Sequence, residues 1–94
     1  MNLDKYPVIN VINIFRGFPR KGLPYKITPY KFMLSSGQKC IVEEIRQFHS
    51  ERSGKGDQMH YTVRCRDGLF YRLVFETRTL TWRLLEGGDQ SNKF

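Results

Sequence analysis

Apolar and polar residues alternate along the second half of the chain. Three alternating sets follow one another, with the apolar members Met59, Tyr61, Val63 and Cys65, then Leu69, Tyr71, Leu73 and Phe75, then Leu80, Trp82 and Leu84. A period of two is typical of a half-buried β-strand. Apolar runs at 30–34 and 38–49 predict two more strands. The polar, glycine-containing stretch 50–57 predicts a mobile loop.

The turns between the alternating sets can be tested against the faces of the strands. A two-residue turn at Asp67-Gly68 would place arginines beside Leu69, because a slip of one residue moves every side chain to the other face. A three-residue loop, Arg66-Asp67-Gly68, avoids this burial and pairs Val63 with Tyr71. Gly68 would then adopt a left-handed conformation. The next loop is centred on Thr77-Arg78 and pairs Phe75 with Leu80.

These two hairpins place one set of apolar side chains on a common inner face. The predicted core is Tyr61, Val63, Cys65, Tyr71, Leu73, Phe75, Leu80, Trp82 and Leu84, with Phe32 and Val42 added. In the strand 38–49, the pattern changes phase after Val42. A β-bulge near Glu43-Glu44 would let Cys40, Val42 and Ile45 share one side.

The segment from Val8 to Phe15 is open to two interpretations. Its apolar residues Val8, Val11, Ile12 and Phe15 have helical spacing, and Pro7 and Gly17 stand at the two ends. Its content of Val, Ile and Asn is that of a poor helix. The sequence allows either a helix or a strand here, and the spacing slightly favours a short helix.

The expected fold is mainly β, an antiparallel meander curled into a small SH3-like open barrel. A basic N-terminal arm (1–29), irregular or in part a short helix, would precede the barrel (30–86), and the tail 87–94 would be disordered. A chain of 94 residues holds one domain at most. It has no apolar run long enough to span a bilayer and no convincing secretion signal. We therefore expect a cytoplasmic protein with reduced cysteines at Cys40 and Cys65 and no membrane partner.

The positive charge is concentrated near the start of the chain. Residues 1–39 contain seven basic residues and one acidic residue, and residues 40–94 contain nine basic and eight acidic residues. Such asymmetry attracts anionic partners. Cations that neutralise phosphates and aromatics that stack on bases are interleaved in the arm, where the candidate residues are Arg16, Phe18, Arg20, Lys21, Tyr25 and Lys26. The alternative is a solvated linker whose aromatics pack on the barrel.

A second candidate surface lies on the sheet face opposite the core. The predicted registers bring Arg64 opposite Phe70 and Arg72 opposite Arg83. Arginines around an exposed aromatic ring can form a platform for single-stranded nucleic acid. The alternative is that the segment Val8 to Phe15 covers the apolar residues of this face and leaves the arginines at its rim.

Catalytic and metal-binding patterns are weak. The stretch SGKGD at 53–57 lacks the residues of a phosphate-binding loop. His49 and His60 can approach each other across a strand pair, but the two cysteines should face the core, so no zinc site is expected. Adjacent Glu43 and Glu44 point to opposite faces of a strand. We expect no enzymatic activity and no cofactor.

Residues 29–86 carry a pattern of core and turn positions: Phe32, Gly37, Val42-Glu43-Glu44-Ile45, Tyr61-x-Val63-Arg64, Asp67-Gly68, Tyr71-x-Leu73 and Trp82-x-Leu84. This pattern resembles short uncharacterised bacterial proteins with a small SH3-like β domain. The resemblance implies the fold of the body and no reaction or ligand. The basic arm lies outside it.

Two functions follow from the sequence. The first is a non-catalytic module that binds nucleic acid through the arm and the arginine-bearing sheet face. The second is a protein–protein interaction module that binds an acidic protein or forms a homodimer, because an open meander leaves strand edges that can pair.

Overall fold

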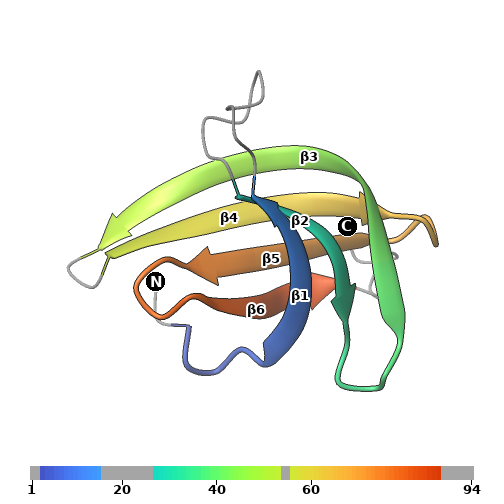
Figure 1. Ribbon diagram of the computed structural model, residues 1–94, viewed down its shortest axis with the longest axis horizontal. Coiled ribbons are helices and arrows are strands. Elements are labelled where there is room, and N and C mark those ends of the chain that lie inside the picture. Colours follow the sequence, from blue (N-terminus) through green and yellow to red (C-terminus); the bar gives the residue numbers. More distant parts are fainter. Residues whose placement is uncertain (1–2, 16–26, 54–55, 88–94) are drawn as a thin grey trace.

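A computed structural model describes residues 3–15, 27–53 and 56–87 of the chain. They form six antiparallel strands in a closed barrel, each paired with its neighbour in the sequence: β1 (Val8–Phe15), β2 (Ile27–Met33), β3 (Lys39–Ser53), β4 (Gly56–Cys65), β5 (Phe70–Glu76) and β6 (Thr81–Gly87). Figure 1 shows β1 and β2 crossing in front of the sheet that β3 to β6 form. The predicted mainly β meander curled into a small SH3-like barrel is therefore confirmed, but the barrel is closed rather than open. Within these residues, no helix is long and apolar enough to cross a membrane.

The loop between β4 and β5 has the predicted three residues. Val63 lies opposite Tyr71, and the amide of Cys65 donates to the carbonyl of Leu69 at 3.0 Å. Gly68 has a φ of +84°, a conformation that glycine adopts without a Cβ clash. Asp67 stabilises the loop from within, because its carboxylate accepts from the amide of Leu69 and from the hydroxyl of Tyr71, each at 2.9 Å.

The loop between β5 and β6 differs from the prediction. Phe75 pairs with Trp82 rather than with Leu80, so the turn spans residues 77–80 and the register is shifted by two residues. Leu80 lies in the turn with a φ of +57° and is 75% exposed, so its assignment to the core is wrong. The faces stay correct, because a shift of two residues preserves the alternation of side chains.

Strand β3 contains the predicted bulge and a second one. The register shifts between Val42 and Glu44 and again between Ile45 and Gln47. Each extra residue changes the phase of the strand, so Val42, Ile45 and Phe48, three residues apart, all pack against the core. The predicted loop 50–57 is wrong, because β3 continues to Ser53 and β4 begins at Gly56.

Residues 8–15 form strand β1, and the short helix that the spacing favoured is wrong. Three of the four residues with helical spacing, Val8, Ile12 and Phe15, are 60%, 62% and 72% exposed, whereas Ile9 between them is buried. β-branched residues fit a pleated strand well, and here the pairing with β2 overrides the weak helical pattern. The strands of the barrel therefore extend into the segment that the sequence assigned to the arm 1–29.

The core fills the barrel with aromatic and aliphatic side chains. The buried cluster is Ile9, Phe32, Cys40, Met59, Tyr61, Val63, Cys65, Tyr71, Leu73, Phe75 and Trp82, with Val42 and Leu84 partly buried against it. Seven of the nine residues predicted for the core belong to this cluster. Both cysteines are free thiols. Burial, more than any other factor, raises the pKa of Cys65 to about 12 and also raises the pKa of Cys40, which keeps both thiols protonated near neutral pH.

Candidate functional site

The predicted residues of the basic arm lie outside the described residues. They are Arg16, Phe18, Arg20, Lys21, Tyr25 and Lys26, and the chain that carries them leaves the barrel at Phe15 and returns at Ile27. The tail 88–94 lies outside the described residues as well. The sites that can be examined at atomic detail are therefore on the barrel itself.

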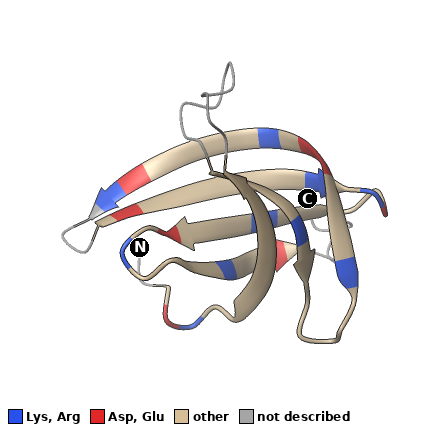
Figure 2. Ribbon diagram, viewed as in Figure 1, with Lys and Arg blue, Asp and Glu red and all other residues tan. Residues whose placement is uncertain are grey.

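Each arginine of the predicted sheet surface is paired with an acid. Arg64 contacts Glu43 at 3.0 Å, Arg72 contacts Glu86 at 2.8 Å and Arg83 contacts Glu76 at 3.2 Å. Figure 2 shows these basic and acidic positions mixed over β3 to β6. Pairing of opposite charges lowers the positive potential that a phosphate chain would meet on this face.

The expected contact of Arg72 with Arg83 is wrong. The same register shift that moves Leu80 into the turn places Arg83 opposite Val74, and a further irregularity between Arg72 and Leu73 places Arg72 opposite Glu86. Arg64 does lie opposite Phe70, as predicted, and the guanidinium of Arg46 lies 5.5 Å from the centre of the Phe70 ring. A cation over the ring is a cation–π contact, so Phe70 already has an intramolecular partner.

The segment before β1, rather than β1 itself, lies against this face. The guanidinium of Arg83 donates to the carbonyl of Tyr6 at 2.8 Å, and the amide of Leu84 donates to the carbonyl of Pro7 at 3.0 Å. Val74, on the same face as Arg83, is fully buried. The face is therefore covered in part, by residues other than those that the sequence indicated.

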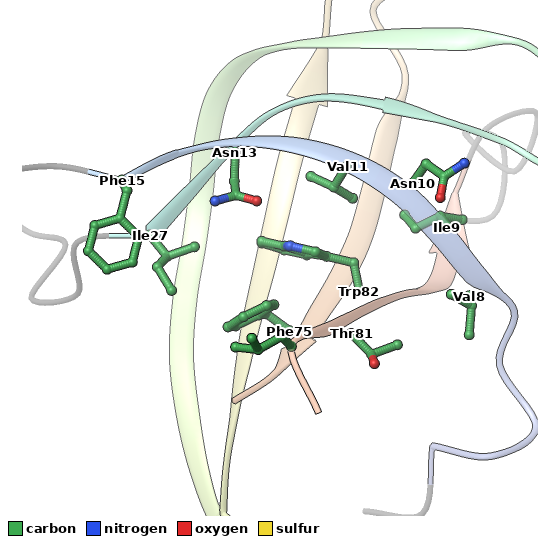
Figure 3. A pocket seen from close by; sticks show the side chains of 11 residues that line it. Val8, Ile9, Asn10, Val11, Asn13, Phe15, Ile27, Phe75, Thr81 and Trp82 are labelled. Atoms are coloured by element: carbon green, nitrogen blue, oxygen red, sulfur yellow. The ribbon is translucent and has the colours of Figure 1, made fainter. Parts of the chain in front are cut away.

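A groove opens where β1 separates from β6. Among the described residues, β1 pairs with β6 only at Val8 and Ile9. Because the two strands are antiparallel, residues 10–15 of β1 run toward and beyond Thr81, where β6 begins. The space left beside β1 has a volume of about 540 Å³. It is lined by residues of β1, β2, β5, β6 and the turn before β6, as Figure 3 shows from close by.

The groove has apolar walls and a tryptophan as its floor. Figure 3 shows Val11 and Asn13 pointing from β1 toward Trp82, with Phe75 beside the indole. The ring centres of Phe75 and Trp82 are 4.9 Å apart. The buried indole Nε1 of Trp82 has no hydrogen-bond partner among the described residues. An unpaired buried N–H is costly, so a carbonyl that reached it from the groove would be stabilised.

The rim of the groove exposes large apolar side chains. Phe15 and Leu80 line the groove and are exposed. Val8 also borders the groove, and it shares the outer face of β1 with the exposed Ile12 and Ile14. Strand β1 contains no charged residue, in contrast to the mixed charges of β3 to β6 in Figure 2. Contiguous exposed apolar side chains are typical of interaction sites. The signal was present in the sequence as VINVINIF, but the helical interpretation placed Val8, Val11, Ile12 and Phe15 on one helix face and so predicted no strand edge.

The edge of β1 adds main-chain groups to this apolar surface. Every second residue of a strand points its N–H and C=O away from one neighbouring strand and toward the other. Residues 10–15 are paired with β2 on one side, and no described strand pairs with them on the other side. Such an edge can accept a further strand.

One cluster of potential metal ligands lies away from this groove, on the hairpin of β3 and β4. His49 lies directly opposite His60, as the sequence suggested, and Glu51 lies on the same face. One ligand atom from each residue lies within 4.8 Å of the others. The two cysteines point into the core, as predicted, and take no part in this cluster.

The site of interest for function is thus the combination of groove, exposed apolar rim and strand edge beside β1. Of the predicted site residues, the four that the structure describes, Arg64, Phe70, Arg72 and Arg83, do not line it, and the arm residues join it in the sequence through Phe15 and Ile27. No family model, no curated protein and no solved structure matches this chain.

Proposed function

We propose that this protein is a non-catalytic binding module that takes up an extended segment of an acidic partner protein along β1. The observation that carries the proposal is the separation of β1 from β6 after Ile9, which opens an apolar groove beside an unpaired strand edge. In this mode the partner adds a strand to the edge of β1. Its main chain supplies hydrogen bonds and alternate side chains enter the groove.

The chemistry of the groove favours a peptide over nucleic acid bases. Its volume of about 540 Å³ is that of a site for a few side chains. Five of its lining residues are aliphatic and three are polar, namely Val8, Ile9, Val11, Ile27, Leu80, Asn10, Asn13 and Thr81. Its rings are the exposed Phe15 and the buried Phe75 and Trp82, whereas platforms for unpaired bases present several exposed rings and cations. Aliphatic walls suit Val, Ile or Leu side chains of a partner strand.

The distribution of charge favours an acidic partner. The chain between Phe15 and Ile27 contains four basic residues and no acidic one, and its two ends both line the groove. Among the described residues, none that lines the groove carries a charge. A partner segment with carboxylates flanking its apolar residues would therefore meet cations and no acid at this site, which increases the rate of association and the selectivity.

Nucleic acid remains the second candidate. It rests on the same four cations and on Phe18 and Tyr25, which alternate with them in the sequence. The paired arginines of the sheet face weaken this candidate, because they offer little net charge beyond the arm. If the arm neutralises about four phosphates, log affinity falls against log salt with a slope of about −4. A peptide complex dominated by apolar contacts has a much smaller slope.

The experiment uses Trp82 as a built-in reporter. It is the only tryptophan of the chain and forms the floor of the groove, so its fluorescence reports directly on the proposed site. A displayed library of ten-residue peptides is selected on the full chain, and the enriched peptides are titrated while the emission of Trp82 is recorded. We expect enriched sequences that alternate Val, Ile or Leu with Asp or Glu. A library without enrichment, or ligands that leave the fluorescence unchanged, contradicts the proposal.

Matched variants separate the groove from the rest of β1. Phe15→Ala and Leu80→Ala each remove an exposed side chain that lines the groove, and Ile12→Ala removes one of similar exposure on the opposite face. The first two should weaken binding by about 10-fold, the loss typical of a contact at the centre of an interface. Ile12→Ala should leave the affinity unchanged. Equal losses in all three would place the contact outside the groove.

Three further measurements distinguish the other occupants. A peptide with alternate backbone N-methyl groups cannot add to a strand edge and should lose binding. Light scattering that shows a stable dimer, broken by Phe15→Ala, would make a second copy of this chain the partner. Binding of a single-stranded oligonucleotide with the steep salt dependence above, and no selected peptide, would favour the nucleic acid function.

A further inference from the structure

We propose that His49, Glu51 and His60 form a binding site for a divalent transition-metal ion, with zinc as its cellular occupant. This site is on the β3–β4 hairpin, and the proposal is independent of the groove beside β1. It departs from the expectation of no metal site, which was drawn from the two histidines together with the two cysteines.

The strand register brings the donors together. His49 and His60 are opposite each other in the antiparallel ladder, and the next pair on the same face is Glu51 and Gln58. Residues two apart on a strand share a face, and opposite Cβ atoms of such a ladder are about 5 Å apart. Four side chains with nitrogen or oxygen donors therefore surround one point of the sheet.

The observed distances are close to those that a metal ion requires. Glu51 lies between the imidazoles, with Oε2 at 3.6 Å from Nε2 of His60 and Oε1 at 3.7 Å from Nε2 of His49. Oε1 of Gln58 lies 3.4 Å from Nε2 of His60. Ligands at 2.0–2.1 Å from a tetrahedral ion are about 3.3 Å from one another. Each of these contacts must shorten by only a few tenths of an ångström.

The larger adjustment falls on His49, which is able to make it. The two imidazole rings are stacked, with centres 4.5 Å apart and planes at 7°. A metal ion lies in the plane of each ring that ligates it, so one ring must tilt out of the stack. The side chain of His49 is 55% exposed and can turn, whereas that of His60 is 6% exposed and is held in place.

The types of donor in the cluster suit a transition-metal ion. Two imidazoles with a carboxylate are donors that suit Zn²⁺ and its neighbours in the first transition row.

Two features limit the affinity and the role of the site. The buried Nδ1 of His60 has no hydrogen-bond partner among the described residues, whereas strong sites hold this nitrogen with an acceptor. The absence of such a partner weakens binding by about 10- to 100-fold. His49 and His60 also line a cavity of about 260 Å³, from which water can occupy the remaining coordination position.

Calorimetric titration of the full chain with zinc chloride tests the proposal. We expect one ion per chain with a dissociation constant on the order of micromolar, and a higher unfolding temperature in the presence of zinc. His49→Ala and Glu51→Gln, both at exposed positions, should each weaken binding at least 10-fold. Arg52→Ala is the matched control, because Arg52 is exposed on the same strand and is not among the donors, and it should bind as the parent does.

Three outcomes would overturn the proposal. The first is a parent protein that shows no saturable binding. The second is a His49→Ala variant that folds and binds zinc with unchanged affinity. The third is a thiolate charge-transfer band in the cobalt-substituted protein, which would place the ion at Cys40 or Cys65.

Discussion

Strands β4 and β1 illustrate opposite ways of building one barrel. Among the described residues, β4 is paired along its whole length with β3 and over seven residues with β5. β1 is paired with β6 at only two residues, after which the groove begins. Both strands contain alternating apolar residues, so the difference lies in their neighbours. A strand with two neighbours has its main-chain groups bonded on both sides, whereas a strand with one open edge leaves main-chain N–H and C=O groups without a strand partner.

Amide hydrogen exchange gives the largest expected contrast between the two strands. Protection of amides in β4 should approach that of global unfolding, because both of its edges are bonded. Amides of residues 10–15 that point away from β2 should exchange faster by several orders of magnitude. Uniform protection across β1 would contradict the open edge. A selected peptide should slow exchange at these amides and leave β4 unchanged.

Truncation of apolar side chains should show the same division in the free energy of unfolding. Leu73 is fully buried and lies opposite Tyr61 of β4, so Leu73→Ala should cost about 2–5 kcal/mol. Ile12 of β1 is exposed, so Ile12→Ala should change the stability by less than about 0.5 kcal/mol. Urea unfolding followed by circular dichroism measures both. A large loss for Ile12→Ala would mean that this face of β1 is covered in solution.

Acid should destabilise the sheet through His60. Burial lowers its pKa in the folded protein below that of the unfolded chain, so the unfolded chain binds the proton more readily. The contribution of His60 to stability is therefore complete above pH about 6.5 and declines as the pH falls through the lowered pKa. Thermal unfolding between pH 7.5 and pH 5 measures it. The decline should be shallower in His60→Gln, and an identical decline would assign the effect to other groups.

The smallest expected effect is that of an exposed ion pair on the charged face. Arg72 and Glu86 are in contact at 2.8 Å with side chains 41% and 45% exposed. Pairs of this kind contribute about 0.2–1 kcal/mol, so Arg72→Met should barely change the unfolding midpoint in urea. The ion pair with Glu86 should also reduce the attraction of Arg72 for anions. Glu86→Gln should therefore increase retention on heparin, and this increase should exceed the decrease caused by Arg72→Met.

Local sequence signals predicted the faces of the strands but not their registers. The three-residue loop at Gly68 could be derived because the wrong alternative would have buried two arginines. The turn before β6 could not, since a shift of two residues keeps every side chain on its face. That shift, with a further irregularity between Arg72 and Leu73, places Arg72 opposite Glu86 rather than Arg83. The predicted pairing of the two arginines was therefore wrong although the faces were right.

The bulge in β3 and the strand β1 show when a pattern of apolar residues predicts structure and when it does not. The change of phase after Val42 is visible in the residues, and the predicted bulge was found there. In β1, Val8, Ile12 and Phe15 have helical spacing, yet all three are exposed side chains of a strand. Their spacing therefore does not mark a buried face. Patterns of apolar residues report burial within the chain, and they mislead where apolar residues of a strand are exposed.

The sequence by itself determined an antiparallel β protein, the inward set of side chains and a concentration of positive charge between Phe15 and Ile27. Each of these follows from local alternation, turn chemistry or composition. The tertiary structure decided that β1 is a strand, that it separates from β6, that the arginines have acidic partners and that two histidines meet a glutamate. These features depend on the pairing of residues far apart in the chain, and local alternation carries no information about which of several equivalent registers gives the lowest free energy.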